Sequence, residues 1–589
     1  MALFRKLLIA NRGEIAVRII RAARELGIAT VAVYSDVDRD ALHVRFADEA
    51  YRLGPAPPAQ SYLNVDRLLD VASRSGADAV HPGYGFFSEN ATFARAVIAQ
   101  GLIWVGPHPA AIESMGDKLR ARTAMAAAGI PIVPGDTTPL ADAAAARDAA
   151  QRFGLPLALK ASGGGGGKGL KIAHTVDEIE AAFGTAAREA AAYFGNGTIY
   201  AERYLIDPKH IELQILADKH GSVLHVGERD CSLQRRHQKL WEEAPPTIPE
   251  TVRVALRDAG VRAARAIGYD SVGTIECLVS GGAFYFLEMN TRIQVEHTVS
   301  EMISGIDLVK EQLRVAAGEP LGYAQEDVVF RGHAIEVRVN AEDPARNFQP
   351  APGTVTRYRE PAGFGVRVDS AAFPGFTIVP DYDSMIAKLI GWDRDRTAAL
   401  ARLRRAIDEY EIVGVPTTLP LLRRLADFAR VIDASYGTAT LEPFALAAAA
   451  ADHVGAKDAG DTQNANTSLP SGTDTIAVEV NGKRFDVRFL DLPALAAPGT
   501  ARNGGAAAKP KGAPKRAAHG NAVTAPMHGS IVEVAVAAGD AVNEAQVLVV
   551  VEAMKMMNEI RAHKAGTVTA VHVKRGDTVD ARAALVTIE

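Results

Sequence analysis

An internal repeat near the C-terminus constrains the fold of this chain more than any other stretch. Residues 529–542 recur as residues 566–579, and in both copies the two turn glycines stand ten positions apart (539 − 529 = 576 − 566 = 10). Apolar residues that alternate between turn glycines are typical of short strands with one buried face. Two matched half-units therefore predict a small, all-β, pseudo-twofold barrel.

A lysine stands in the segment that joins the two half-units. Residues 552–556 read Glu-Ala-Met-Lys-Met, so we expect Lys555 at a tight turn that displays its amine. An exposed lysine in a plain β-domain is the alternative. Repeat and motif together resemble the biotinyl, lipoyl-like carrier domain, a flattened barrel in which this lysine is biotinylated. The resemblance implies covalent biotin at Lys555, attached by a biotin protein ligase.

Length and composition limit the class of protein. A chain of 589 residues is long enough for several domains, and a formal charge of −5 provides no basic field for nucleic acid. Cys231 and Cys277 are too few for a disulfide scaffold and lack metal-site spacing. The N-terminal apolar run reads as a first strand, and no apolar stretch approaches the roughly 20 residues of a membrane helix. We expect a cytoplasmic enzyme that binds neither nucleic acid nor membrane.

Residues 5–114 alternate apolar, strand-like runs with amphipathic helical stretches. This alternation of strand-like and helical stretches predicts a parallel sheet covered by helices. Asn11-Arg-Gly-Glu14 lies at a strand-to-helix junction, where ligands commonly bind in such folds. Residues 81–86, His-Pro-Gly-Tyr-Gly-Phe, display aromatic side chains among one proline and two glycines and are predicted to form a second functional loop. An ordinary turn is the alternative for that loop.

A glycine-rich loop is the feature of the sequence that most strongly indicates a nucleotide-binding site. Five consecutive glycines, Gly163 to Gly167, follow an apolar run and are flanked by Lys160 and Lys168. Backbone without side chains can approach phosphate oxygens closely and point several N–H groups at them. It is not a Walker A loop, because no Ser or Thr follows the lysine. A flexible linker is the alternative interpretation.

Two predicted strands downstream carry carboxylates. Residues 274–279 and 283–290 are joined by a Gly-Gly turn, so Glu276, Glu288 and Asn290 are expected to project from adjacent strands toward one point. Their oxygens suit Mg²⁺ and nucleotide phosphates, and a salt-bridged structural role is the alternative.

The stretch that follows, residues 292–297, also alternates. We expect a strand that places Arg292, Gln294 and Glu296 on one face. That face offers a guanidinium for an anion, an amide for orientation and a carboxylate that can act as a base.

Six ordered motifs resemble those of the ATP-grasp ligases, and among them the biotin carboxylases, over residues 1 to about 445. They are N-R-G-E-I-A at Asn11, H-P-G-Y-G at His81, G-D-K at Gly116, G-G-G-G-G-K-G at Gly163, R-D-C-S-L-Q-R-R-H-Q-K at Arg229 and E-M-N-T-R-I-Q-V-E-H at Glu288. The resemblance implies an α/β and α+β multidomain fold. Its parts would be a pre-ATP-grasp α/β domain over residues 1–114, an ATP-grasp domain with a glycine-rich lid over 115–330, and an α+β domain over 331–445. Thr298 departs from the family form, in which proline often follows the Glu-His pair, and it leaves the catalytic residues intact.

The character of the sequence changes after residue 445. Residues 446–522 are rich in small residues and in proline, and they read as a linker with a β-hairpin at 476–489 around an Asn-Gly turn. The carrier domain is expected over residues 523–589.

The resemblance also implies a role for individual residues. ATP would be held by Lys118, Lys160, Gly164, Gly165, Gly166, Gly167, Glu202, Leu205, His210, Gln234 and His237. Mg²⁺, with Mn²⁺ as an alternative, would be held by Glu276, Glu288 and Asn290. Bicarbonate would lie among Lys239, Arg292, Gln294 and Val295. The catalytic residues would be Glu296, which takes the proton of bicarbonate, Arg338, which stabilises an enolate-like oxygen of biotin, Lys239 and Arg292, with Tyr84 and Gly85 approaching biotin.

Carboxylated biotin is useful only if a carboxyltransferase then passes the carboxyl group to an acceptor. Residues 446–522 are too few for a carboxyltransferase, so that activity is expected on another chain. Chains of this size with a carboxylase and a carrier resemble the α subunits of acyl-CoA carboxylases, which act on acetyl-CoA, propionyl-CoA or similar esters. Such α subunits associate with a carboxyltransferase β subunit, and their carboxylase domains form homo-oligomers within a larger complex. The alternatives are a subunit of a pyruvate or other keto-acid carboxylase, and a biotin carrier and scaffold with a degenerate ligase domain.

Overall fold

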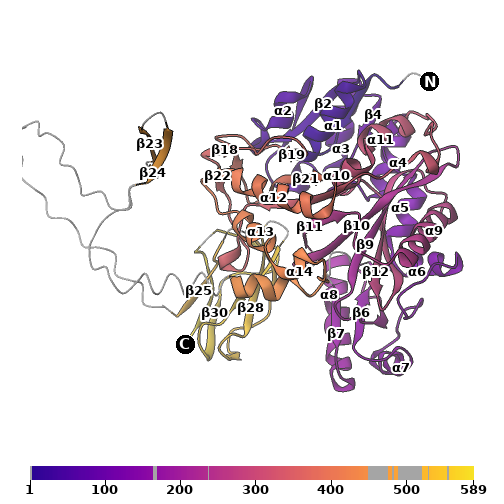
Figure 1. Cartoon of the computed structure of the whole chain (residues 1–589). Coiled ribbons are helices and arrows are strands. Elements are labelled where there is room, and N and C mark those ends of the chain that lie inside the picture. Colours follow the sequence, from indigo (N-terminus) through magenta and orange to yellow (C-terminus); the bar gives the residue numbers. More distant parts are fainter. Residues whose placement is uncertain are drawn as a thin grey trace, which may run out of the picture.

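The computed structural model describes residues 3–163, 169–235, 238–448, 475–480, 483–488, 521–527, 529–553, 556–580 and 582–589 (Figure 1). Six of the predicted site residues lie outside the described residues: Gly164, Gly165, Gly166, Gly167, His237 and Lys555.

The N-terminal part contains a five-stranded parallel sheet in the order β3-β2-β1-β4-β5. Its strands are β1 (Lys6–Ile9), β2 (Ala29–Ser35), β3 (Glu49–Gly54), β4 (Ala79–His81) and β5 (Ile103–Trp104). The helices of this part are α1 (Gly13–Glu25), α2 (Leu42–Phe46), α3 (Val65–Ser75), α4 (Ala91–Ala99) and α5 (Pro109–Gly116). Leu7 and Ile9 of β1 are fully buried in one cluster with Ile15 and Ile19 of α1, so the apolar face of the helix covers the sheet. The expectation of a helix-covered parallel sheet is confirmed.

The two loops that stood out in the sequence follow the neighbouring strands β1 and β4 and touch each other. The side-chain amide of Asn11 donates to the carbonyl of Pro82 at 2.7 Å and to that of Tyr84 at 2.8 Å. Because the carboxyl ends of neighbouring parallel strands meet at one edge of a sheet, distant parts of the sequence come together there.

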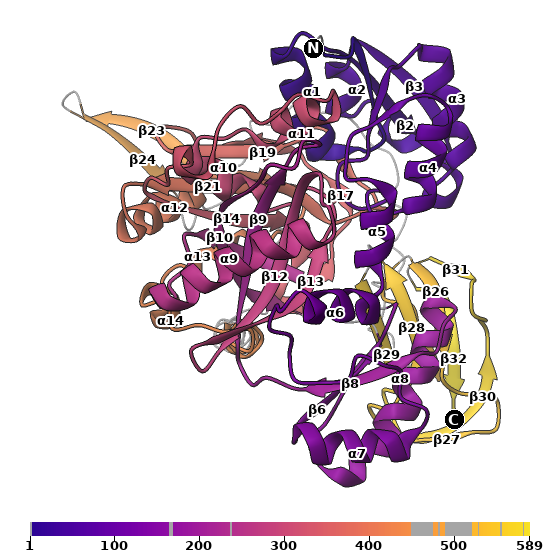
Figure 2. The ribbon, with the colours of Figure 1, turned by 90° about the vertical axis from the view of Figure 1, so that its right-hand side faces the viewer.

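An eight-stranded antiparallel sheet runs through the middle of the molecule (Figure 2), in the order β13-β12-β9-β10-β11-β14-β21-β19. Its strands are β9 (Lys209–Ala217), β10 (Val223–Arg235), β11 (Gln238–Ala244), β12 (Ser271–Ser280), β13 (Ala283–Asn290), β14 (His333–Asn340), β19 (Val366–Ser370) and β21 (Met385–Asp393). The helices α9 (Glu250–Ala266), α10 (His297–Ser304), α11 (Leu308–Ala316) and α12 (Arg396–Glu409) contact it. Trp241 of β11 is fully buried with Val337 of β14 and Leu403 of α12. The pairing of β11 with β14 therefore continues one sheet across two stretches of the chain that the sequence assigns to different domains.

A buried carboxylate, Glu243, secures that pairing of β11 with β14. Its side chain contacts His333 of β14 at 2.8 Å and accepts a hydrogen bond from Arg396 of α12 at 2.7 Å. Burial alone would raise the pKa of Glu243, but His333 and Arg396 lower it to about 2.

The low pKa of Glu243 predicts a pH-dependent contribution to stability. A carboxylate whose pKa is lowered on folding stabilises the protein above its unfolded pKa of about 4.3, and this contribution is lost as the pH falls toward the folded pKa. We expect Glu243→Gln to lower the free energy of unfolding by on the order of 3 kcal/mol at pH 7. Urea unfolding at pH 7 and pH 4 measures it, and the difference from the wild type should shrink at the lower pH; a difference independent of pH would contradict the assignment.

A smaller three-stranded sheet, in the order β7-β6-β8, stands apart in sequence from the main one. It consists of β6 (Leu157–Ala161), β7 (Leu170–Ala173) and β8 (Ile199–Arg203), and its helices are α7 (Ala143–Phe153) and α8 (Ile179–Phe194). Leu157 and Leu159 pack with Ala146 and Ala149 of α7. Residues 164–168, between β6 and β7 in the sequence, lie outside the described residues.

Residues 521–589 form two four-stranded sheets, β25-β32-β30-β27 and β29-β28-β26-β31. The strands are β25 (Ala522–Thr524), β26 (Gly529–Val534), β27 (Ala541–Val542), β28 (Val547–Ala553), β29 (Met556–Arg561), β30 (Gly566–Val571), β31 (Thr578–Val579) and β32 (Ala584–Ile588). Each half of the repeat pairs with the other, because β26 contacts β31 and β27 contacts β30. The expected all-β, pseudo-twofold carrier fold is confirmed.

Two further expectations concern the segments near this domain. β23 (Thr475–Val480) and β24 (Lys483–Arg488) pair antiparallel, which confirms the hairpin expected around Asn481 and Gly482, although these two residues lie outside the described residues. Among the described helices, none is both long enough and apolar enough to cross a membrane.

Candidate active site

Lys239 of β11 lies at the centre of a buried group of three carboxylates. Its ammonium is 2.6 Å from Glu296 Oε1 and 3.0 Å from Glu276 Oε1, and it also pairs with Glu212 of β9. Burial opposes the charge on Lys239, yet the three carboxylates raise its pKa well above the ordinary value. The lysine is therefore a fixed positive charge that holds side chains from three segments of the chain together.

Glu296 is held from its other side by Arg338 of β14. The guanidinium donates from Nη2 to Glu296 Oε2 at 3.0 Å and from Nε to Glu242 Oε1 at 2.6 Å. Burial favours the protonated form of Glu296, but Lys239 and Arg338 hold the pKa of this carboxyl below its ordinary value against the repulsion of Glu212. A buried carboxylate that stays ionised between two cations can accept a proton.

The segment from Asn290 to Glu296 does not form the strand that was predicted for residues 292–297. β13 ends at Asn290, residues 291–296 are irregular, and Glu296 is the N-cap of α10, so the expected strand with Arg292, Gln294 and Glu296 on one face is wrong. The chain has to leave the sheet and enter a helix within six residues, which ends the strand alternation. As a result Gln294 donates to Glu276 Oε1 at 2.8 Å, whereas Arg292 pairs with Glu89 at 2.9 Å.

The carbonyl of Val295 is anchored from the opposite side of this loop. Lys388 of β21, which has no exposed side-chain surface, donates to it at 3.1 Å. The same ammonium lies 3.3 Å from Glu14 and 3.6 Å from Asp369. Lys388 therefore fixes the peptide that precedes Glu296.

Glu276, Glu288 and Asn290 lie on paired strands, as expected. Glu276 and Glu288 face each other in the β12–β13 register, and the Asn290 amide donates to Glu276 Oε1 at 2.9 Å. Glu288 pairs with Lys118, the first residue of α6 (Lys118–Ala127). Oxygen donors of this kind on neighbouring strands suit Mg²⁺ or Mn²⁺.

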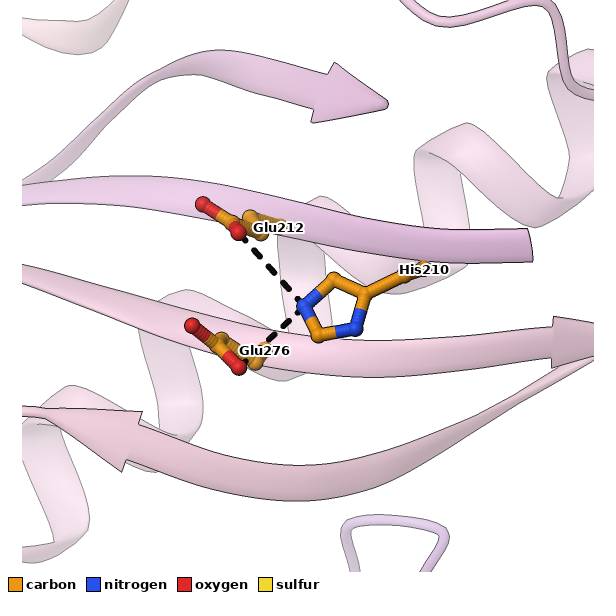
Figure 3. A group of neighbouring side chains, drawn as sticks. All are labelled: His210, Glu212 and Glu276. Carbon is orange, nitrogen blue, oxygen red and sulfur yellow. Dashed lines mark ion pairs between the residues drawn. The ribbon is translucent and has the colours of Figure 1, made fainter. Parts of the chain in front are cut away.

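His210 adds a nitrogen to this edge of the sheet (Figure 3). Its Nε2 is 3.1 Å from Glu276 Oε2 and 3.5 Å from Glu212 Oε1, and the three ligand atoms lie within 4.8 Å of one another. Burial alone would lower the pKa of His210, but Glu276 and Glu212 raise it to about 9. The buried Nε2 makes no hydrogen bond of good geometry to a described residue. These three ligand atoms would fit a divalent cation once His210 has lost its proton, because a metal ion binds the neutral imidazole.

The described residues that are predicted to hold ATP lie on or next to five elements: α6, β6, β8, β9 and β10. Lys160 of β6 pairs with Glu202 of β8, which also accepts a hydrogen bond from Arg122 at 2.8 Å. Leu205 follows β8 and is partly buried, and the Gln234 amide donates to the carbonyl of Cys231 at 2.9 Å. The two lysines predicted to contact phosphates, Lys118 and Lys160, are thus each neutralised by a carboxylate, which an anionic ligand would have to replace.

Tyr84 and Gly85 lie in the loop after β4 described above. The Tyr84 hydroxyl is buried without a hydrogen-bond partner among the described residues, and the Lys388 ammonium lies 5.9 Å from the centre of its ring. Gly85 has a φ of 68°, which favours glycine.

Several residues at the centre were missed from the sequence. Arg229 is fully buried and donates to Glu212 Oε2 at 2.8 Å and to Gln294, so it orders both groups. Glu212 follows His210 by two positions, and strand alternation places both on one face, which is a signal the sequence carries. Glu242 and Lys388 have no such signal, because their partners come from distant segments.

The eight-stranded sheet, the smaller sheet and this charged centre define an ATP-grasp ligase. Family models match four stretches: "Biotin carboxylase, N-terminal domain" at residues 3–112, "Carbamoyl-phosphate synthase L chain, ATP binding domain" at 117–324, "Biotin carboxylase C-terminal domain" at 336–443 and "Biotin-requiring enzyme" at 521–588. The chain belongs to the biotin carboxylases, joined here to a biotin carrier domain.

Individual proteins agree with this assignment. The chain is 44% identical over 595 residues to the biotin-dependent acyl-coenzyme A carboxylase alpha3 subunit of Mycobacterium leprae (strain TN), covering 98% of this chain and 97% of the relative. It is 52% identical to a pyruvate carboxylase subunit of Methanothermobacter thermautotrophicus, over 71% of this chain and 85% of that protein. A crystal structure of the biotin carboxylase domain dimer of Hydrogenobacter thermophilus 2-oxoglutarate carboxylase, with MgADP, ADP and bicarbonate, matches with a TM-score of 0.73 and 49% identity over 75% of this chain and 98% of that chain.

Proposed function

We propose that this chain uses ATP and bicarbonate to carboxylate biotin carried on Lys555 of its own C-terminal domain. The observation that carries the proposal is the placement of the ionised Glu296 between Lys239, at 2.6 Å, and Arg338, at 3.0 Å. Glu296 takes the proton of bicarbonate, and the bicarbonate oxygen then attacks the γ-phosphorus of ATP to give carboxyphosphate and ADP. Carboxyphosphate breaks down to CO₂ and phosphate, the phosphate takes the proton from the ring nitrogen of biotin, and that nitrogen attacks CO₂ to give carboxybiotin.

Positive groups stabilise the charge that develops in these steps. Bicarbonate is held among Lys239, Arg292, Gln294 and Val295, and ATP phosphates by Lys118, Lys160 and the glycine loop. Arg338 stabilises the enolate-like oxygen of biotin when its ring nitrogen loses a proton. The remaining nucleotide contacts are assigned to Glu202, Leu205, His210, Gln234 and His237, and the biotin approach to Tyr84 and Gly85.

The divalent cation is assigned to Glu276, Glu288 and Asn290. When bound, Mg²⁺ or Mn²⁺ neutralises charge on the phosphates of ATP. Glu288, which pairs with Lys118 in this structure, would be one of the residues that hold the metal, and Lys118 would then be available to a phosphate. The solved relative with MgADP and bicarbonate supports these ligands for this chain.

The carboxyl acceptor is assigned to the acyl-CoA class. A relative that matches over both the carboxylase and the carrier parts is the α subunit of an acyl-CoA carboxylase. Accordingly, a separate carboxyltransferase β subunit transfers the carboxyl group to acetyl-CoA, propionyl-CoA or a similar ester, a biotin protein ligase loads Lys555, and the carboxylase domains dimerise in the cytoplasm. The domain limits proposed are 1–114, 115–330, 331–445, 446–522 and 523–589.

A pyruvate or other keto-acid acceptor is the second candidate. The similarity to the pyruvate carboxylase of Methanothermobacter thermautotrophicus favours it, although that match spans only 71% of this chain. Purification through the biotin group, followed by identification of the partner and assays with acyl-CoA esters and keto acids, distinguishes the two. We expect carboxylation of an acyl-CoA ester; carboxylation of a keto acid alone would overturn the acceptor assignment. Absence of all label from [¹⁴C]bicarbonate on the protein would favour a scaffold with a degenerate ligase domain.

A further inference from the structure

Two side-chain hydrogen bonds between described residues join the start of α10 to β14. The first is the hydrogen bond from Arg338 Nη2 to Glu296 Oε2, at 3.0 Å. Two positions further along α10, and two positions earlier in β14, the hydroxyl of Thr298 donates to Glu336 Oε2. Glu296 is the N-cap of α10 and Thr298 lies in its first turn, while strand alternation places Glu336 and Arg338 on one face of β14.

The second contact is closed to water. Thr298 and Glu336 both have no exposed surface. A hydrogen bond in such a place cannot be replaced by one to solvent, so its loss leaves a buried polar group unpaired. The contact is therefore a specific constraint on how the first turn of α10 lies against β14.

The partner of Thr298, Glu336, lies among other buried charged groups, so its position affects them. Glu336 stands opposite Glu242 in the β11–β14 register, and Glu242 accepts a hydrogen bond from Arg338 at 2.6 Å. Burial, together with the neighbouring Glu242, raises the pKa of Glu336 well above its ordinary value, although Lys388 opposes the shift. One oxygen of Glu242 and one of Glu336 have no hydrogen-bond partner among the described residues. Glu336 is thus a third buried carboxyl group near Arg338, after Glu296 and Glu242, and the Thr298 hydroxyl fixes the position of the Glu336 oxygen that accepts its hydrogen bond.

We propose that Thr298 is a positioning residue for the carboxylation reaction: by holding Glu336, it fixes the first turn of α10 on β14 and so keeps Glu296 in register with Arg338. The inference rests on the proposed roles of these two residues. Reacting groups have to be held within about 0.5 Å of their productive geometry, and a displacement of about 1 Å can reduce the rate by about a hundredfold. A hydroxyl two residues from the base is close enough to exert that control.

The test compares Thr298→Val, which keeps the shape but removes the hydroxyl, with Thr298→Ser, which keeps the hydroxyl. For biotin-dependent ATP hydrolysis we expect Thr298→Val to lower kcat about tenfold with an unchanged KM for ATP, and Thr298→Ser to restore most of the loss. Ser304→Ala is the matched control, since Ser304 donates to the carbonyl of Ser300 at 2.7 Å at the far end of the same helix, and its kcat should equal that of the wild type.

A double-substitution cycle tests whether Thr298 acts through Glu336. If it does, Thr298→Val combined with Glu336→Leu should lose no more kcat than the worse of the two single variants, because both substitutions break the same contact. Losses that multiply, or a serine variant as slow as the valine variant, would overturn the proposal. Should Thr298→Val fail to fold, as judged by its thermal transition, Thr298→Ala takes its place in the same comparison.

Failure of this inference can be told apart from failure of the proposed function. If Glu296→Gln is inactive while Thr298→Val turns over like the wild type, the base assignment stands and the positioning role falls. If Glu296→Gln keeps full activity, the proposed chemistry itself is wrong.

Discussion

Replacement of Glu296 by glutamine is expected to lower biotin-dependent ATP hydrolysis by roughly 10²- to 10⁴-fold, the range attributed to a positioned general base. Glutamine has nearly the same shape as glutamate but cannot accept a proton from bicarbonate. The side chain is 2% exposed, so water does not readily replace the carboxylate. The KM for ATP should change little, because the residues assigned to the nucleotide lie on other segments.

A matched control separates this effect from a general loss of charge. Glu250→Gln changes a glutamate on α9 whose side chain is 72% exposed, and its turnover should equal that of the wild type. Wild-type turnover by Glu296→Gln would show that another group removes the proton. Thermal unfolding of both variants checks that the fold is intact.

The carrier fold could be predicted from the sequence because its signal is local and repeated. Glycines at the same spacing in two copies, with alternating apolar residues between them, are enough to specify strands and turns. The sequence pattern does not show which strands pair. In the structure β26 pairs with β31 and β27 pairs with β30, so each half of the repeat is completed by the other.

The acidic edge of the site was also predictable, for the same reason. A Gly-Gly turn between two apolar runs sets the register that brings Glu276 opposite Glu288. The course of the chain after Asn290 was not. Alternation between Arg292 and Glu296 indicates a strand, yet Glu296 occupies the N-cap position of α10, since tertiary packing of that helix overrides a five-residue pattern.

The partners that fix the charges were beyond sequence reasoning. Arg338 meets Glu242, 96 positions away, and Lys388 meets the Val295 carbonyl, 93 positions away. A lysine or glutamate at such a position reads as an ordinary strand residue, because only the assembled sheet shows that it is buried and paired. The sequence motifs therefore predict which residues take part in the reaction, whereas the structure adds which residues hold them.

Lys555→Arg is expected to abolish biotinylation of the chain completely. Attachment of biotin requires a deprotonated amine as nucleophile, and an arginine guanidinium keeps its charge and cannot provide one, although it preserves the positive charge of the site. Lys555 lies outside the described residues, but the strands on either side are described: β28 and β29 pair through Ala553 and Met556. A streptavidin blot of the full chain measures the effect, and Lys574→Arg, in the exposed turn region of the second repeat, is the matched control that should remain biotinylated.

If Lys555→Arg still binds streptavidin, the attachment site is wrong. If the blot is lost while carboxylation of free biotin persists, the carrier and the carboxylase are separate functions of one chain, and the lysine delivers the substrate without contributing to the chemistry at Glu296.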